Sequence, residues 1–161
     1  MAPGKFSFDY EVYDSSDALS PEDAGLLQDA RDFTATAYAP YSRFHVAAVA
    51  RLKNGQVVRG TNQENASYPV GTCAERALLG ALGALFPDEP IEVMAITYRN
   101  MQGSSKAPAS PCGMCRQSLH EYEKRTNQPI RLILAGTEGK VYVIPKASYL
   151  LPLGFSSEDL K

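Results

Sequence analysis

The chain has 161 residues, of which 44% are hydrophobic and 21% charged, and its formal net charge is −2 at pH 7. A chain of this length favours one domain with a hydrophobic core of its own. Its charge gives no electrostatic reason to expect a nucleic acid or an anionic membrane as a partner. No apolar run approaches the roughly 20 residues that cross a bilayer, and the first residues lack the apolar stretch of a signal peptide. We therefore expect a cytoplasmic protein.

The first 20 residues are predicted to be an extension of a catalytic domain that spans 21–161. Apolar residues alternate with more polar ones in this extension, at Phe6, Phe8, Tyr10 and Val12. The alternation predicts a short strand with one buried face. We expect this strand to lie at the edge of a sheet or at an interface.

A long helix is predicted from Ser20 to about Tyr38. Ser20 suits the N-cap and Pro21 the first helical position. Apolar residues then recur at helical spacing, which predicts a helix with one buried face. Pro40 ends the pattern.

Strands and helices alternate along the rest of the chain. Asn54-Gly55 is a two-residue hairpin signal between strands predicted at 46–52 and 56–60, and 61–72 is expected to be a loop. The remaining predictions are helices from about Ala74 to Leu85, from about Gly113 and over 146–151, and strands over 93–98, 130–135 and 141–144. We therefore expect an α/β fold of three layers, α/β/α, around a mixed sheet of about five strands.

The three cysteines of the chain are placed in a pattern that indicates a metal site. Cys112 and Cys115 form a C-x-x-C pair at the predicted start of one helix, and Cys73 stands at the predicted start of another. The positive end of a helix dipole favours the thiolate that zinc requires. Three protein ligands leave one position of a zinc ion open for water, as in catalytic sites. The alternatives are a redox pair or unrelated core cysteines.

Glu75 stands two residues after Cys73. In a regular helix, residues two apart point about 200° away from each other. The two side chains can therefore share a site only if Cys73 lies at the non-helical entrance of its helix. We interpret Glu75 as a catalytic group. The alternative is a solvated glutamate that the helix dipole favours.

These residues resemble a known family. Cys73-Ala74-Glu75 followed by Pro111-Cys112-Gly113-Met114-Cys115 is similar to the C-A-E…P-C-x-x-C signature of cytidine deaminases. The segments 38–44 (YAPYSRF) and 62–69 (NQENASYP), and the closing LLP of 150–152 with Phe155, resemble further motifs of that family. The resemblance covers the chain from about residue 24 onward. It implies a homotetramer with shared active sites, and one zinc ion per subunit on the three cysteines.

The resemblance also implies an activity, the hydrolytic deamination of cytidine or 2′-deoxycytidine in pyrimidine salvage. In zinc deaminases the metal activates a water and a glutamate that is not a ligand moves the protons, which is the role implied for Glu75. Asn62 and Glu64 match the residues that bind the ribose hydroxyls, and their groups together donate and accept hydrogen bonds. A carboxylate near the sugar would repel a phosphate, which favours a free nucleoside. Two polar loop residues are the alternative.

Further substrate-binding residues follow from the same resemblance. Ala74 belongs to the signature, and Phe44 matches an aromatic residue beside the pyrimidine. Phe155 matches an aromatic residue that is donated to a neighbouring subunit's site, and Tyr68 one at a contact between subunits. The alternatives are a core residue at a strand entry for Phe44, a C-terminal docking residue for Phe155 and core packing for Tyr68.

Arg76 is interpreted as a donor to the sulfurs. Three thiolates and one Zn²⁺ sum to a net charge of −1, which a neighbouring guanidinium would offset. Arg116 is a weaker candidate for the same role, and a surface arginine is the alternative for both. His45 and His120 are expected to face solvent or to pack rather than to bind metal.

Two rival functions remain open from the sequence. One is a related deaminase that acts on an aminonucleoside antibiotic, a nucleotide or an RNA base, although Asn62 and Glu64 argue against the charged substrates. The other is a structural zinc module that binds partners. Structural zinc sites use four protein ligands, and the sequence holds no fourth cysteine.

Overall fold

A computed structural model describes Met1 and residues 3–161 of the chain. The strands are β1 (Glu11–Tyr13), β2 (Phe44–Leu52), β3 (Val57–Thr61), β4 (Ile91–Asn100), β5 (Arg131–Ala135) and β6 (Val141–Ile144). The helices are α1 (Pro21–Phe33), α2 (Ala74–Leu85) and α3 (Gly113–Thr126), with short 3-10 helices η1 (Ser16–Ala18), η2 (Thr34–Thr36), η3 (Tyr68–Val70), η4 (Ala147–Leu150) and η5 (Ser157–Leu160). Among the described residues, no helix is long and apolar enough to span a membrane.

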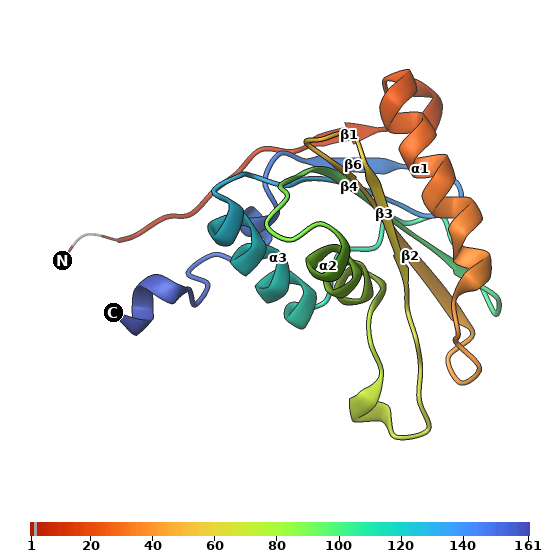
Figure 1. Cartoon of the computed structure of the whole chain (residues 1–161). Helices are drawn as coiled ribbons and strands as arrows, with labels where there is room; N and C mark the ends of the chain where they lie inside the picture. Colours follow the sequence, from red (N-terminus) through yellow and green to blue (C-terminus); the bar gives the residue numbers. More distant parts are fainter. Residues whose placement is uncertain (2) are drawn as a thin grey trace.

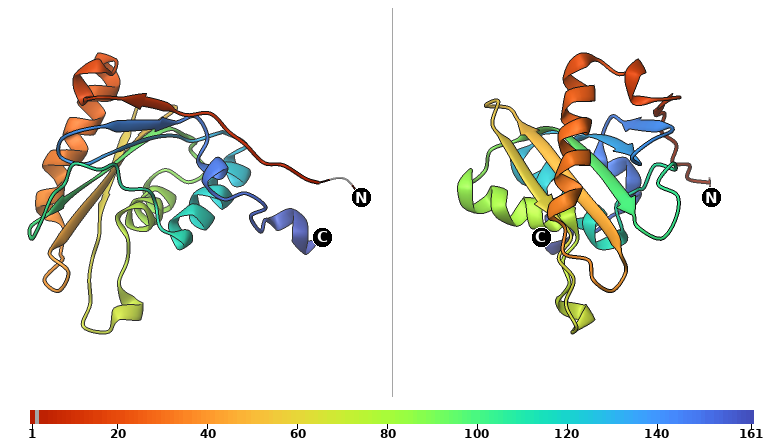
Figure 2. Two further views of the ribbon diagram at one scale, coloured as in Figure 1. Left: turned by 180° about the vertical axis from the view of Figure 1, so that it is seen from behind. Right: turned by 90° about the vertical axis from the view of Figure 1, so that its right-hand side faces the viewer.

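The strands form one mixed sheet in the order β1-β6-β5-β4-β2-β3, with α1 on one face and both α2 and α3 on the other (Figures 1 and 2). The predicted α/β/α architecture is therefore confirmed. The sheet has six strands within the described residues, and the strand beyond the five expected is β1 at its edge.

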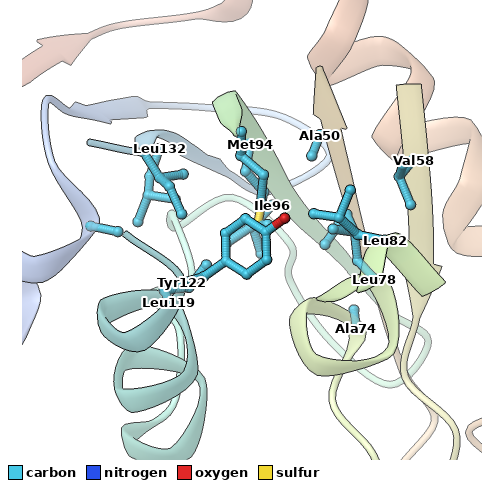
Figure 3. Packing of buried hydrophobic residues seen from close by; sticks show 14 of the residues in the cluster. Ala50, Val58, Ala74, Leu78, Leu82, Met94, Ile96, Leu119, Tyr122 and Leu132 are labelled. Carbon is cyan, nitrogen blue, oxygen red and sulfur yellow. The ribbon is translucent and has the colours of Figure 1, made fainter. Parts of the chain in front are cut away.

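Each face of the sheet carries its own hydrophobic core, because side chains alternate along a strand. In β4, Val93 and Ala95 pack towards α1, whereas Met94 and Ile96 pack towards the other two helices. Figure 3 shows the cluster that contains Met94 and Ile96, where side chains of α2 and α3 pack against the sheet. A strand covered on both faces is apolar along most of its length, and Val93 to Tyr98 is buried throughout, with Thr97 as its one hydroxyl-bearing aliphatic residue.

The topology places the starts of α2 and α3 at the same end of the sheet. Strands β4 and β5 pair in parallel, and α3 connects them. Strands β3 and β4 both run antiparallel to β2, so they run parallel to each other, and α2 connects them. Each helix therefore follows the carboxyl end of a strand, where open α/β sheets place their ligands.

Helix α1 ends earlier than the sequence predicts. Ser20 caps it as expected, since its hydroxyl accepts a hydrogen bond from the Asp23 backbone N–H at 3.2 Å. The helix stops at Phe33 rather than near Tyr38, and a 3-10 turn follows. Tyr38 instead forms a β-bridge with Gln63. Gln63 also forms a β-bridge with Thr72, so part of the predicted loop 61–72 is paired.

The N-terminal strand lies later in the chain than the pattern of residues 6–12 predicts. Strand β6 has only four residues, and it pairs antiparallel with Glu11–Tyr13. The residues before β1 are held by aromatic contacts instead. The ring of Phe8 lies 5.5 Å from that of Tyr149, and the ring of Tyr10 lies 5.3 Å from that of Tyr142.

Gly60 of β3 lets the first turns of α2 approach the sheet closely. A Cβ atom at this position would overlap the backbone nitrogen of Leu78 and lie 2.5 Å from the carbonyl oxygen of Ala74. Such contacts are with backbone, which cannot rotate away. The close approach therefore fixes where α2 begins, and with it the position of Cys73.

Gly60→Ala is expected to lower the free energy of unfolding by about 1–3 kcal/mol, because the added methyl group forces α2 off the sheet. Urea denaturation measures the change. The matched control is Gly80→Ala in α2, where a Cβ meets open space, and it should raise the free energy of unfolding by about 0.5–1 kcal/mol. Equal effects of both substitutions would contradict this description of the packing.

Candidate active site

The structure brings the three cysteines together at the starts of α2 and α3. Cys73 is the N-cap of α2 and Cys112 the N-cap of α3, and both have extended backbone conformations. Cys115 lies one turn further along α3 and is fully buried. The three sulfur atoms lie within 4.8 Å of one another. Cys73 thus lies outside its helix, as sharing a site with Glu75 requires.

The spacing of the sulfurs fits a tetrahedral ion. The Sγ atoms of Cys73 and Cys112 are 3.8 Å apart, and those of Cys112 and Cys115 are 3.4 Å apart. A disulfide needs about 2.05 Å, whereas Zn–S bonds of about 2.3 Å in tetrahedral geometry separate two sulfurs by roughly 3.8 Å. Neither N-cap thiol is used to cap its helix, so both are available as ligands.

The thiols are also electrostatically unequal. A hydrogen bond with Cys115 lowers the pKa of Cys73 to about 6, and the positive charge of Arg76 acts in the same direction. The same hydrogen bond, together with burial, raises the pKa of Cys115. Cys73 therefore ionises more readily than Cys115, and a bound cation would favour the thiolate form of its ligands.

The cluster has no fourth protein ligand among the described residues. No other His, Cys, Asp or Glu of Met1 and residues 3–161 joins the group of three. A structural zinc site would be closed by such a side chain. The donor set is therefore that of an open site, in which a small molecule can reach the metal.

A cavity of about 200 Å³ opens directly beside the cluster. It is lined by Phe44, Val46, Asn62, Cys73, Ala74, Glu75, Ile96, Ala109, Ser110 and Cys112. Four of the residues expected at the substrate or in catalysis are among them: Phe44, Asn62, Ala74 and Glu75. Sequence reasoning missed Val46, Ile96, Ala109 and Ser110. The small residues directly before Pro111 were a usable signal for the last two.

Glu75 is the buried acid of this cavity. It lies in the first turn of α2 and only 4% of its surface is exposed. Burial raises its pKa, although hydrogen bonds from its own backbone N–H and from Cys115 act in the opposite direction. The contact with Cys115 places its carboxyl group against the sulfur cluster. A solvated surface glutamate, which was the alternative, does not describe this position.

Asn62 joins the cavity wall to the start of β2. Its Nδ2 donates to the Phe44 carbonyl oxygen at 2.9 Å, and its Oδ1 accepts from the Val46 backbone N–H at 2.8 Å. Each group of the amide retains capacity for one further hydrogen bond. Phe44, whose position these bonds help to fix, stacks on Tyr98 with ring centroids 4.6 Å apart.

Glu64 lines a separate hollow of about 420 Å³ rather than the cavity of Glu75. Its Oε2 accepts hydrogen bonds from the backbone N–H groups of Tyr41 and Ser42, at 2.9 and 3.2 Å. Desolvation raises its pKa, but hydrogen bonding with the Ser42 side chain and with these two backbone N–H groups outweighs it, so that the pKa is lowered. Tyr68 lines the same hollow, is 75% exposed and meets Tyr41 edge to face.

The remaining expected residues lie around the site without lining its cavity. Phe155 is 57% exposed, and its carbonyl accepts a hydrogen bond from the Gln117 side chain at 2.9 Å. Arg76 contributes its charge to Cys73. Arg116 donates to the carbonyl groups of Pro111 and Leu150, not to a sulfur as the sequence suggested. His45 and His120 are partly buried and stand outside the cluster.

Comparisons with known proteins agree with a metal site at these cysteines. The sequence model described as "Cytidine and deoxycytidylate deaminase zinc-binding region" matches residues 21–128. A cytidine deaminase of Halalkalibacterium halodurans is 37% identical over 135 residues, which are 84% of this chain and 95% of that protein. The chain belongs to the cytidine deaminase family. Its three-cysteine cluster is accordingly a zinc site.

Other members of the cytidine deaminase family support the same assignment. A cytidine deaminase of Mycobacterium tuberculosis is 39% identical over 138 residues, covering 84% of this chain and 90% of that protein. The crystal structure of a cytidine deaminase from Burkholderia pseudomallei superposes with a TM-score of 0.71 at 33% identity. The match covers 85% of this chain and all of the Burkholderia pseudomallei chain. This chain therefore has residues with no counterpart in that structure.

Cys112→Ser is expected to reduce the zinc content from about one ion per chain to well below half, because one of three thiolate ligands is lost. Metal analysis of the purified protein after gel filtration measures this. Met114→Ser is the matched control, since Met114 lies between Cys112 and Cys115 in the chain and is 61% exposed. Zinc content that falls equally in both variants would contradict the assignment of Cys112.

Proposed function

We propose that the chain hydrolyses the exocyclic amine of cytidine and 2′-deoxycytidine, which yields uridine or 2′-deoxyuridine and ammonia. The observation that carries this proposal is the position of Glu75, a buried carboxyl group in contact with a three-thiol zinc cluster at the wall of one cavity. The names of the related proteins support the choice of base. A structural zinc module would need neither the buried acid nor the cavity.

The separate roles of zinc and Glu75 follow from their chemistry. Zinc in an open site of this kind is a Lewis acid that makes water nucleophilic near neutral pH. Glu75 would accept one proton of the water whose oxygen bonds to C4, and deliver that proton to N3 of the ring. A second transfer through the same carboxyl group would carry the remaining proton of the new C4 hydroxyl group to the amine, so that the C4–N bond breaks and ammonia leaves. Burial keeps bulk water away from these transfers.

The cavity walls suit a flat pyrimidine. Phe44, Val46 and Ile96 provide apolar surface, and the stacking of Phe44 on Tyr98 holds its ring in place. Asn62 retains one donor and one acceptor for a ribose hydroxyl. We infer that the base enters between these apolar side chains and that the sugar remains near Asn62.

Glu64 would bind the same sugar from the separate hollow that it lines. Gln63 pairs with both Tyr38 and Thr72 in β-bridges, so the segment 62–64 is extended and its first and last side chains project to the same side. The lowered pKa of Glu64 keeps its carboxyl group charged at neutral pH. A charged carboxylate near the sugar favours a free nucleoside over a nucleotide, whose phosphate it would repel.

We further propose that the protein is a homotetramer that binds one zinc ion per subunit. Tyr68 and Phe155 are largely exposed and lie outside the cavity of their own chain, which suits residues that complete a neighbour's site. Residues 21–161 would form the catalytic domain and 1–20 an addition, since the family match begins at residue 21.

Glu75→Gln tests the assignment of the proton carrier. The substitution removes the acid and keeps the shape of the side chain, so zinc should stay bound while kcat for cytidine falls by about 10²–10⁴-fold. Ammonia release and metal analysis on the same sample give the two readouts. Glu22→Gln, on the exposed start of α1, is the control and should leave both unchanged. A Glu75→Gln variant with normal kcat would refute the assignment.

Glu64→Gln tests the choice of a free nucleoside. The amide oxygen can still accept from the Tyr41 and Ser42 backbone, so the loop is kept and only the charge is lost. We expect KM for cytidine to rise about tenfold, as for the loss of one charge-assisted hydrogen bond. The ratio of kcat/KM for cytidine to kcat/KM for cytidine 5′-monophosphate should fall. Steady-state kinetics with both substrates measure this. An unchanged preference would contradict the proposed role of the carboxylate.

A further inference from the structure

Arg116 bridges two backbone carbonyl groups that lie far apart in the sequence. Its Nε donates to the Pro111 carbonyl oxygen at 2.8 Å, and its Nη1 donates to the Leu150 carbonyl oxygen at 3.0 Å. The first of these carbonyls directly precedes Cys112, and the second belongs to the last residue of η4. The guanidinium thus connects the cysteine loop to a separate part of the fold.

The Pro111 end of the bridge sets the position of Cys112. Cys112 has an exposed thiol, an extended backbone and no side-chain cap bond, so its place depends on its main-chain torsions. The Arg116 backbone N–H bonds the Cys112 carbonyl at 2.9 Å, while its side chain bonds the carbonyl one residue earlier. One residue therefore holds two consecutive peptide groups at the ligand.

The Leu150 end of the bridge is itself firmly anchored. Glu123, a buried residue of α3, accepts hydrogen bonds from the backbone N–H groups of Ala147 and Ser148 in η4 at 3.0 and 3.1 Å. Next to Arg116, the side chain of Gln117 holds the Phe155 carbonyl. Arg116 and Gln117 of α3 therefore hold both Cys112 and the C-terminal segment that carries Phe155.

Arg116 has no carboxylate partner in the described part of the chain, where each ion pair involves another basic residue. No acid pairs with its charge among these ion pairs, and it directly follows the ligand Cys115 in the chain. The printed hydrogen bonds of its half-buried side chain go to backbone carbonyl groups, so its contribution is to hold the main chain beside the ligands.

We propose that Arg116 is a positioning residue of the zinc centre, which holds Cys112 in the ligating geometry by clamping the Pro111 carbonyl to η4. The proposal rests on the zinc site of the proposed function, but it concerns how the metal is retained rather than which substrate is used. Groups that orient metal ligands in this way typically contribute 10–100-fold to metal affinity or activity.

The experiment measures zinc release from the full-length holoenzyme to a chromogenic chelator at 25 °C. Arg116→Met should release zinc about 10–100-fold faster than the wild type. Arg125→Met is the matched control, because Arg125 lies on the same helix and pairs with the exposed Asp88. Tyr122→Phe, which loses a hydrogen bond to the Glu89 carbonyl, controls for general loss of stability in α3. Both controls should release zinc within about twofold of the wild-type rate.

A second readout separates positioning from stability. In the cobalt-substituted protein, Arg116→Met should change the ligand-field bands, whereas Tyr122→Phe should leave them unchanged even if its melting temperature falls. Should Arg116→Met not fold, Arg116→Lys takes its place, because an ammonium keeps the charge but not the planar fork. It should release zinc several-fold faster.

Release at the wild-type rate with unchanged cobalt bands, in whichever Arg116 variant folds, would overturn the proposal. Failure of the proposed function gives a different result. In that case the wild type would hold zinc and release no ammonia from cytidine, while the Arg116 variants would still differ from their controls in zinc release.

Discussion

The starts of α2 and α3 have to meet at one point, because three sulfurs carried by two helices can hold one ion only within about 4 Å of each other. The sheet makes this possible. The connections β3-α2-β4 and β4-α3-β5 move across the sheet in the same direction, and crossovers of one hand then lie on one face. Both helices therefore pack side by side, and both begin at the carboxyl ends of their strands.

The same constraint explains the character of the cavity. Its floor is the first turn of α2, which Gly60 allows to lie directly against β3. Further lining comes from the start of β2, from Ile96 in the middle of β4 and from the loop before α3, and most of these side chains are apolar. In such surroundings a charge is screened weakly. The zinc cluster and Glu75 can therefore influence each other and a bound base strongly.

Much of this arrangement could be predicted from the sequence, because it depends on local signals. The bounds of α2 follow from its composition, and the position of Cys73 outside the helix follows from its two-residue distance to Glu75. The predicted hairpin is confirmed, with Gly55 at a φ of 84°. The early end of α1 was missed, because Tyr38 pairs with Gln63, which lies distant in the sequence.

Long-range pairings account for what the sequence could not show. Val46 and Ile96 share the cavity wall because β2 pairs with β4, and no local pattern specifies that register. The hydrogen bond from Arg116 to the Leu150 carbonyl spans 34 residues and has no local signal. From the sequence, Arg116 could therefore only be assigned to the sulfurs of the neighbouring cysteines. The distance between Glu64 and the cavity of Glu75 likewise depends on how the segment 62–64 pairs with Tyr38.

The most direct test of the central claim is a zinc titration of the metal-free protein during turnover of cytidine. Ammonia release and zinc binding are followed together, with cytidine 5′-monophosphate as the comparison substrate. If the two helix starts form one catalytic zinc site, activity rises in proportion to bound zinc and stops at about one ion per chain. Ammonia release without zinc, or full zinc binding without deamination of cytidine, would contradict the account.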